Sequence, residues 1–165
     1  MGVQDCMMRG ILAGLVATAP MSLAMGAMKL LLPRREQYPL PPHQITSDLA
    51  EKVGAGEKMG PGARSVAAAV GHFGYGAAQG GLYGAIARRL PGPAVLKGIV
   101  FGLAVWAGSY LGLLPLTGIY RPATEYPPRR NALMIAAHVV WGAGLGLLFA
   151  AGGIGSVPGL GSEES

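Results

Sequence analysis

The chain has 165 residues and a formal net charge of +5, and 51% of its residues are hydrophobic while only 13% are charged. With a mean hydropathy of +0.41, this composition is too apolar for an ordinary soluble domain and predicts an integral membrane protein. The basic residues flank the apolar segments, as charges at membrane ends do. We therefore interpret the basic excess as a topology signal and do not expect nucleic-acid binding.

Crossing a hydrocarbon core takes about 20 mostly apolar residues. Four segments meet this length, at 10–32, 66–87, 96–119 and 132–151. The length of the first segment and the acidic Asp5 before it favour a retained membrane helix over a cleaved signal peptide. We expect an all-α, four-helix transmembrane bundle that forms one integral membrane domain over residues 1–165, with a flexible tail at 153–165.

The long connection 33–63 is expected to hold a short helix on the membrane surface. The run 38–42 contains three prolines and favours an extended, polyproline-like start. Apolar residues then follow at helical spacing, and glycines between 54 and 62 are expected to end the helix. The apolar positions are Ile45, Leu49 and Val53, with Thr46, Ser47 and Asp48 as candidate caps.

Two offsets of the sequence against itself indicate an internal duplication. An offset of 88 places Gly10 and Gly14 on Gly98 and Gly102. An offset of 66 matches a second set: Arg64 with Arg130, His72 with His138, Gly76 with Gly142, and Gly80 with Gly146. The predicted repeats cover about 9–90 and about 96–152. Because each repeat contains two crossings, we expect two parallel two-helix repeats related by an axis along the membrane normal.

A histidine is followed by two glycines at four-residue spacing in the second helix of each predicted repeat. Four-residue spacing places these residues on one helix face, where small residues let helices approach closely. The helix-packing residues are therefore Gly76, Gly80, Gly142 and Gly146. The preceding arginines, Arg64 and Arg130, are candidate contacts for an anion or a lipid headgroup. Each imidazole would lie roughly 12 Å from its arginine, level with the other near a shared axis.

His72 and His138 form the candidate polar or ligand site, because an ionisable group within lipid needs a partner. The sequence leaves three interpretations open: a structural hydrogen bond, a path for a proton, ion or small solute, and axial ligation of haem b. Two histidines make an incomplete metal site, so no metal is expected. Met21, Met25 and Met28 share a helix face typical of adaptable packing, with Cu(I) binding as the alternative. The predicted spans contain no Asp or Glu and no nucleophile–base constellation, so we expect no catalytic residues and no enzyme.

Several short motifs, in the same order along the chain, resemble the YagU-like family of small bacterial inner-membrane proteins of unknown function. They are Pro39-Leu40-Pro41-Pro42, Gly71-His72, Gly98 with Gly102, Leu114-Pro115-Leu116-Thr117-Gly118, and Ala137-His138-Val139-Val140-Trp141. The resemblance implies a multi-pass protein of the bacterial inner (plasma) membrane with four crossings, and it transfers no catalytic residue.

We expect a non-enzymatic accessory or scaffold subunit of a membrane assembly, without a cofactor. Its partners would be the lipid bilayer and a membrane protein or further copies of this chain. The alternatives are a transporter or channel-like protein for a proton, ion or small solute that uses the paired histidines, and a bis-histidine b-type haem protein.

Overall fold

The computed structural model describes residues 2–34, 37, 39–54, 56–119 and 121–152, and within them all regular secondary structure is helical. This confirms the predicted all-α class. The predicted tail at 153–165 lies outside the described residues. The elements are α1 (Val3–Leu30), α2 (Pro41–Lys52), η2 (Gly56–Lys58), α3 (Pro61–Ile86), α4 (Ala94–Ala107), the π-helical η3 (Gly108–Leu113), α5 (Leu114–Leu116), η4 (Ala123–Glu125) and α6 (Pro128–Ala151).

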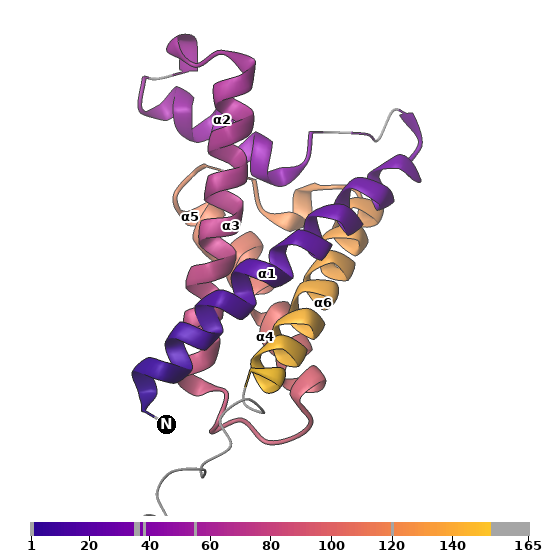
Figure 1. Cartoon of the computed structure of the whole chain (residues 1–165). Helices are drawn as coiled ribbons and strands as arrows, with labels where there is room; N and C mark the ends of the chain where they lie inside the picture. Colours follow the sequence, from indigo (N-terminus) through magenta and orange to yellow (C-terminus); the bar gives the residue numbers. More distant parts are fainter. Residues whose placement is uncertain (1, 35–36, 38, 55, 120, 153–165) are drawn as a thin grey trace, which may run out of the picture.

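The long helices alternate in direction, and α2 lies beside the N-terminal part of α3 at one end of the molecule (Figure 1). Helix α1 packs along both α3 and α6, and α4 packs along α6, whereas α3 and α4 have few contacts. The helices therefore follow the order α3, α1, α6, α4, and the arrangement is open between α3 and α4. A closed four-helix bundle, as the sequence predicts, would have a fourth long contact at this place.

Three helical segments are long and apolar enough to cross a membrane: Val3–Leu30, Ala94–Leu116 and Pro128–Gly152. Helix α3 has 26 residues and is not among these three segments; glycine and alanine make up about half of it, and it also contains His72 and Gln79. Large apolar side chains are exposed on the outside of the long helices, among them Leu12, Leu23, Val70, Val100 and Leu147. Extensive exposed apolar surface marks a contact with lipid or protein, so these helices have the features of a membrane protein.

Glycines bring the backbones of paired helices into direct contact. A Cβ atom on Gly80 of α3 would lie 2.8 Å from Cα of Gly14 in α1. In the second pair, a Cβ atom on Gly142 of α6 would lie 2.8 Å from the carbonyl carbon of Gly98 in α4. Neither site has room for a side chain. All four glycines that the sequence assigns to helix packing lie at these two contacts, which also include Gly76 and Gly146.

The contacts of the two helix pairs correspond, but at a different offset from the one that sequence identity indicates. Cβ atoms on Gly10 and Gly98 would meet Gly80 and Gly142, respectively. Likewise, Gly84 faces Cys6 and Met7, and Gly146 faces Ala94 and Val95. The first helices correspond at the predicted offset of 88, whereas the second helices correspond at 62 (Gly80 with Gly142) and not at 66. This difference of four residues is about one helical turn, or roughly 6 Å along the axis.

Helix α2 starts earlier than the sequence indicates. Its first residue is Pro41, because proline is well tolerated at the first helical position, where its missing N–H costs no hydrogen bond. The expected caps therefore lie inside the helix, and the Thr46 hydroxyl donates to the Pro42 carbonyl at 2.7 Å. Gly54 follows the helix with φ of 70°, a left-handed conformation that glycine adopts without strain. The predicted glycine stop is in place.

Candidate functional site

A cavity of about 380 Å³ lies where α3 and α4 diverge, and α2 covers it at one end. Pockets for small molecules have volumes of roughly 300–1,000 Å³ and mostly apolar walls with a few polar groups. This lining is of that kind. It comprises Thr18, Met21 and Met25 of α1; Pro42, Ile45, Thr46 and Leu49 of α2; Ala67, Ala68, Gly71, His72, Tyr75, Gly76 and Gln79 of α3; Val105, Ser109, Tyr110, Leu113 and Leu114 of α4, η3 and α5; and His138 and Trp141 of α6.

His138 is buried in the wall that α6 contributes, with 6% of its surface exposed. Its Nδ1 lies 2.8 Å from the Met134 carbonyl oxygen, one turn earlier in the helix. A carbonyl only accepts hydrogen bonds, so Nδ1 carries the hydrogen and donates, and in the neutral ring Nε2 is an acceptor. The ring meets Tyr110 edge to face, with ring centroids 6.0 Å apart. No described protein group hydrogen-bonds Nε2, which lies at the ring edge away from its own backbone.

His72 lines the same cavity from α3. Its Nε2 is shielded from solvent and has no hydrogen-bond partner among the described residues. A buried polar group without a partner costs roughly 1–3 kcal/mol, so a bound molecule or water that hydrogen-bonds this atom would be stabilised.

The two histidines are not equivalent by packing, although they share one cavity. At the offset of 62, His138 corresponds to Gly76, and His72 corresponds to Met134. The prediction that the imidazoles lie level as symmetry mates is therefore wrong by about one turn. It is wrong because sequence identity aligned the histidines, whereas the glycine contacts set the relative position of the helices.

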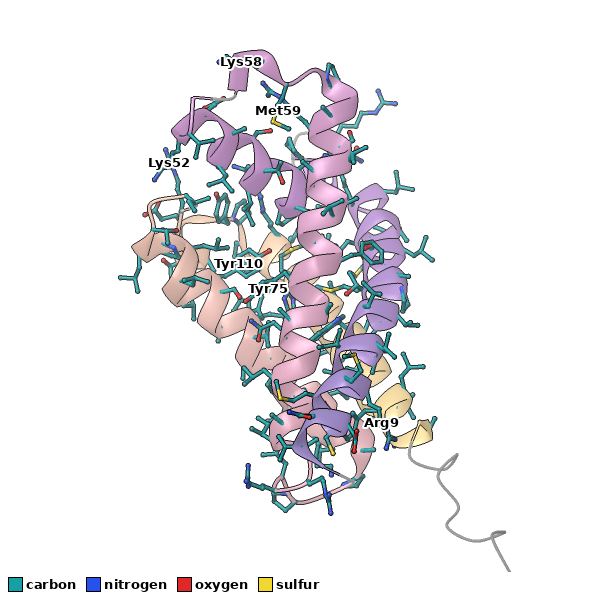
Figure 2. The ribbon with its side chains drawn as sticks, turned by 60° about the vertical axis from the view of Figure 1, so that its left-hand side comes forward. Arg9, Lys52, Lys58, Met59, Tyr75 and Tyr110 are labelled. Atoms are coloured by element: carbon teal, nitrogen blue, oxygen red, sulfur yellow. The ribbon has the colours of Figure 1, made fainter. Side chains whose placement is uncertain are left out.

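A hydrogen bond of 2.8 Å between the Tyr75 hydroxyl and Ser109 Oγ joins α3 to η3 across the gap. Figure 2 shows Tyr75 and Tyr110 in the space between these elements. The wide π-helical turn of η3 brings the consecutive residues Ser109 and Tyr110 to the same cavity. None of these three residues is predicted from the sequence to belong to the site. The available signal was Pro115, which lacks an N–H, favours a local irregularity in the helix and follows this turn.

Trp141, Thr18 and Gly14 make a connected set of hydrogen bonds at the wall formed by α1 and α6. Trp141 Nε1 donates to the Gly14 carbonyl and to Thr18 Oγ1, both at 3.2 Å. Thr18 Oγ1 in turn donates to the Gly14 carbonyl at 2.8 Å. Met21 and Met25 of the methionine face line the cavity beside them, whereas Met28 packs elsewhere against the core. These polar groups already have partners, so they shape the cavity without requiring a ligand.

The two candidate headgroup arginines bind the chain itself. Arg130 is only 8% exposed, its Nη2 donates to Gln44 Oε1 of α2 at 2.9 Å, and its guanidinium lies 4.2 Å from the centre of the Tyr126 ring. Arg64 Nε donates to the Met59 carbonyl at 3.1 Å, and its Nη2 donates to the Gly56 carbonyl. Both arginines therefore hold the connection around α2 against the long helices.

Within the part of the chain that the structure describes, no group of three or more His, Cys, Asp or Glu side chains is close enough to hold a metal ion. Among the nitrogen groups of the lining, Nε2 of His138 has no hydrogen bond from a described residue, and Nε2 of His72 lacks a partner but is shielded from solvent. The arrangement is suited to hydrogen bonding with a molecule in an apolar surrounding.

These helices and this cavity define the class: a helical membrane protein with an internal, largely apolar site. The chain belongs to the family described as "Protein of unknown function (DUF1440)", whose model matches residues 21–146. That range includes every cavity-lining residue except Thr18. No curated protein and no solved structure matches the chain.

Proposed function

We propose that this protein is a multi-pass membrane protein that holds a small, largely apolar molecule in the cavity between α3 and α4. The observation that carries this proposal is the cavity itself. Two histidines line it, and Nε2 of each imidazole has no hydrogen-bond partner among the described residues. Apolar walls with a few polar groups are the usual form of a small-molecule site. The proposal develops the small-solute alternative of the sequence analysis.

Four membrane crossings are part of this proposal, with α3 as the fourth. Helix α3 exceeds the roughly 20 residues that a crossing needs. It runs antiparallel to α1, and its glycine face packs along α1. On its other side, Val66, Val70 and Leu82 are exposed, as expected for contact with acyl chains. Small residues at the helix contact and large apolar ones outside are typical of packing in lipid.

Descent from a duplicated helical hairpin is also part of the proposal. The recurrence of glycine contacts in the α1–α3 and α4–α6 pairs supports it. After the duplication, the second helix of one copy would have shifted by one turn along its partner. Sequence similarity between α3 and α6 therefore gives an offset of 66, whereas their glycine contacts give an offset of 62. The location in a bacterial inner membrane is supported by the resemblance in sequence.

The test of a bound molecule uses a pair of neighbouring alanines in α3. Ala68 is buried and lines the cavity, so Ala68→Leu would fill part of it; Ala69 is exposed, so Ala69→Leu is the matched control. We expect 1-naphthol, a small apolar probe, to raise the thermal unfolding temperature of the purified wild type and of Ala69→Leu, because ligand binding stabilises the folded state. 1-Naphthol should raise the thermal unfolding temperature of Ala68→Leu much less. Equal shifts in all three proteins, or no shift in any, would overturn the proposal.

A bis-histidine b-type haem protein is the second candidate, favoured by the two Nε2 atoms at one cavity. Such a protein would show a Soret band and, on reduction, a separate sharp α-band. A purified protein without this absorption, after expression with haem supplied, would eliminate the haem.

The accessory or scaffold role has a separate test. If the chain has this role, we expect another membrane protein to co-purify with it. That protein should remain bound when both His72 and His138 are replaced by alanine. Loss of the partner in that double variant would instead connect partner binding to the cavity.

A further inference from the structure

We infer that the cavity selects a membrane-soluble molecule bearing a hydroxyl group, of the phenol or alcohol class, whose O–H donates to Nε2 of His138. This inference rests on the proposed function and names the ligand chemistry of the same site. It follows from the hydrogen-bonding roles of polar groups around the cavity.

The role of Nε2 in His138 is set by the other nitrogen of the ring. Nδ1 donates to the Met134 carbonyl, so the hydrogen of a neutral imidazole is on Nδ1 and Nε2 has a free lone pair. No carboxylate side chain lines the cavity, so nothing there compensates a positive charge on the buried ring. The atom presented to a ligand is therefore an acceptor, and a ligand that carries a donor can pair with it.

Four polar groups of the lining have hydrogen bonds elsewhere and do not donate to this atom. The Tyr75 and Ser109 hydroxyls bond to each other across the α3–η3 gap. Trp141 Nε1 and the Thr18 hydroxyl donate to groups of α1. A ketone, ether or ester would leave Nε2 of His138 unpaired, since such molecules only accept hydrogen bonds. A hydroxyl donates to that atom.

The remainder of the ligand must be apolar. Most of the cavity wall is apolar, including Ile45, Val105 and Leu114. Leu49, Leu113 and Tyr75 line the cavity and are also partly exposed, with Tyr75 at 40%. A molecule that reaches the cavity past these side chains passes an apolar surface, so it arrives from the lipid phase more readily than from water.

The test compares 1-naphthol with its methyl ether, 1-methoxynaphthalene, because the two share a ring system and differ in the O–H donor. We expect wild-type protein to bind the naphthol roughly tenfold more tightly than the ether, after correction for partition into detergent, since one buried hydrogen bond supplies about that factor. This comparison needs no variant and is measured by ligand-dependent thermal stabilisation.

Two substitutions at one position assign the preference to Nε2. His138→Asn retains an amide near the position of Nδ1 and loses the acceptor at Nε2, so the naphthol preference should fall to near unity. His138→Gln reaches the position of Nε2 with an amide oxygen and should retain most of the preference. His43→Asn, at an exposed histidine that does not line the cavity, is the control and should behave as wild type.

The outcomes separate this inference from the proposed function. If wild-type protein binds both probes equally, the hydroxyl selectivity is overturned and the proposed function stands. If neither probe binds, the proposed function itself fails. A preference that persists in His138→Asn would overturn the assignment to His138, and a preference lost in both His138→Asn and His138→Gln, with unchanged thermal stability without ligand, would overturn the role of an acceptor at Nε2.

Discussion

Individual glycines in α1, α3, α4 and α6 decide how closely the helices approach. At Gly10, Gly14, Gly98 and Gly102 the neighbouring backbone lies where a Cβ atom would be. Close backbone contact maximises dispersion and permits Cα–H···O contacts, which matter in lipid because burial of apolar surface gives little driving force between helices there. The stability of each helix pair therefore depends on the absence of a Cβ methyl group at each of these glycines.

Two glycines of α3 give a matched test of this dependence. Gly80→Ala would place a Cβ atom 2.8 Å from Cα of Gly14, whereas Gly74→Ala would meet no atom within 4 Å. We expect Gly80→Ala to destabilise the protein by about 1–3 kcal/mol through overpacking. Gly74→Ala should be neutral or stabilise it by up to about 1 kcal/mol, because alanine is the better helix former. Thermal unfolding in detergent measures both, and equal stability of the two variants would contradict the glycine contact.

The Tyr75–Ser109 hydrogen bond is a second residue-scale test. Tyr75→Phe and Ser109→Ala each remove one partner. In a double-mutant cycle we expect a coupling of about 1 kcal/mol, because the two side chains are the pair that joins α3 to η3. Unfolding free energies of the four proteins give the coupling directly. A coupling near zero would mean that the bond does not hold the two elements together.

At the scale of elements, α2 is attached to the long helices through specific side chains. Arg130 of α6 bonds Gln44 from a buried position, whereas Lys52 bonds the Thr117 carbonyl from an exposed one. A hydrogen bond to a buried charge contributes more than an exposed one, which water and salt weaken. Arg130 is therefore the main polar attachment of the helix that covers the cavity.

We expect Arg130→Met to increase amide hydrogen exchange in α2 by roughly tenfold or more, the factor that corresponds to about 1.4 kcal/mol. Gln44→Met should act in the same direction because it removes the partner. Lys52→Met is the control and should leave exchange nearly unchanged. Hydrogen exchange followed by mass spectrometry measures the three variants, and similar exchange in Arg130→Met and Lys52→Met would disprove the special role of the buried arginine.

At the scale of the whole molecule, large apolar side chains cover the outside of the long helices, whereas the core combines small residues with large ones such as Tyr83, Trp141 and Leu145. Ala13, Ala17 and Ala137 are in the core, while Leu23 and Leu116 are among the most exposed side chains. An exterior of large apolar side chains is stable when acyl chains surround the helices. If α3 crosses the membrane, its two ends lie on opposite sides.

If α3 crosses the membrane, cysteines at Lys58 and Arg89, both exposed and near its opposite ends, should react with an impermeant maleimide from opposite sides. The background is Cys6→Ser, since Cys6 is the single cysteine of the chain and is buried. Gly2→Cys should react from the same side as Arg89→Cys, because α1 begins at the end of the molecule where α3 finishes (Figure 1). Labelling of Lys58→Cys and Arg89→Cys from one side would show that α3 does not cross.

The sequence by itself determined the helical class and the approximate position of each long helix, because apolar length and proline and glycine positions act locally. It also identified His72 and His138, which line the cavity. The glycines of the helix contacts were identified in the same way. It misplaced the start of α2 because proline fits the first turn of a helix as well as an extended run.

Only the tertiary structure decided the relative position of the second helices and the opening between α3 and α4. A shift of four residues leaves nearly the same side chains on the same helix face, so helical periodicity does not distinguish an offset of 62 from one of 66. The cavity exists because α1 packs along α6 while α3 and α4 separate, which is a contact between segments far apart in the chain. For the same reason Tyr75 and Ser109 became recognisable as a pair only once the helices were in place.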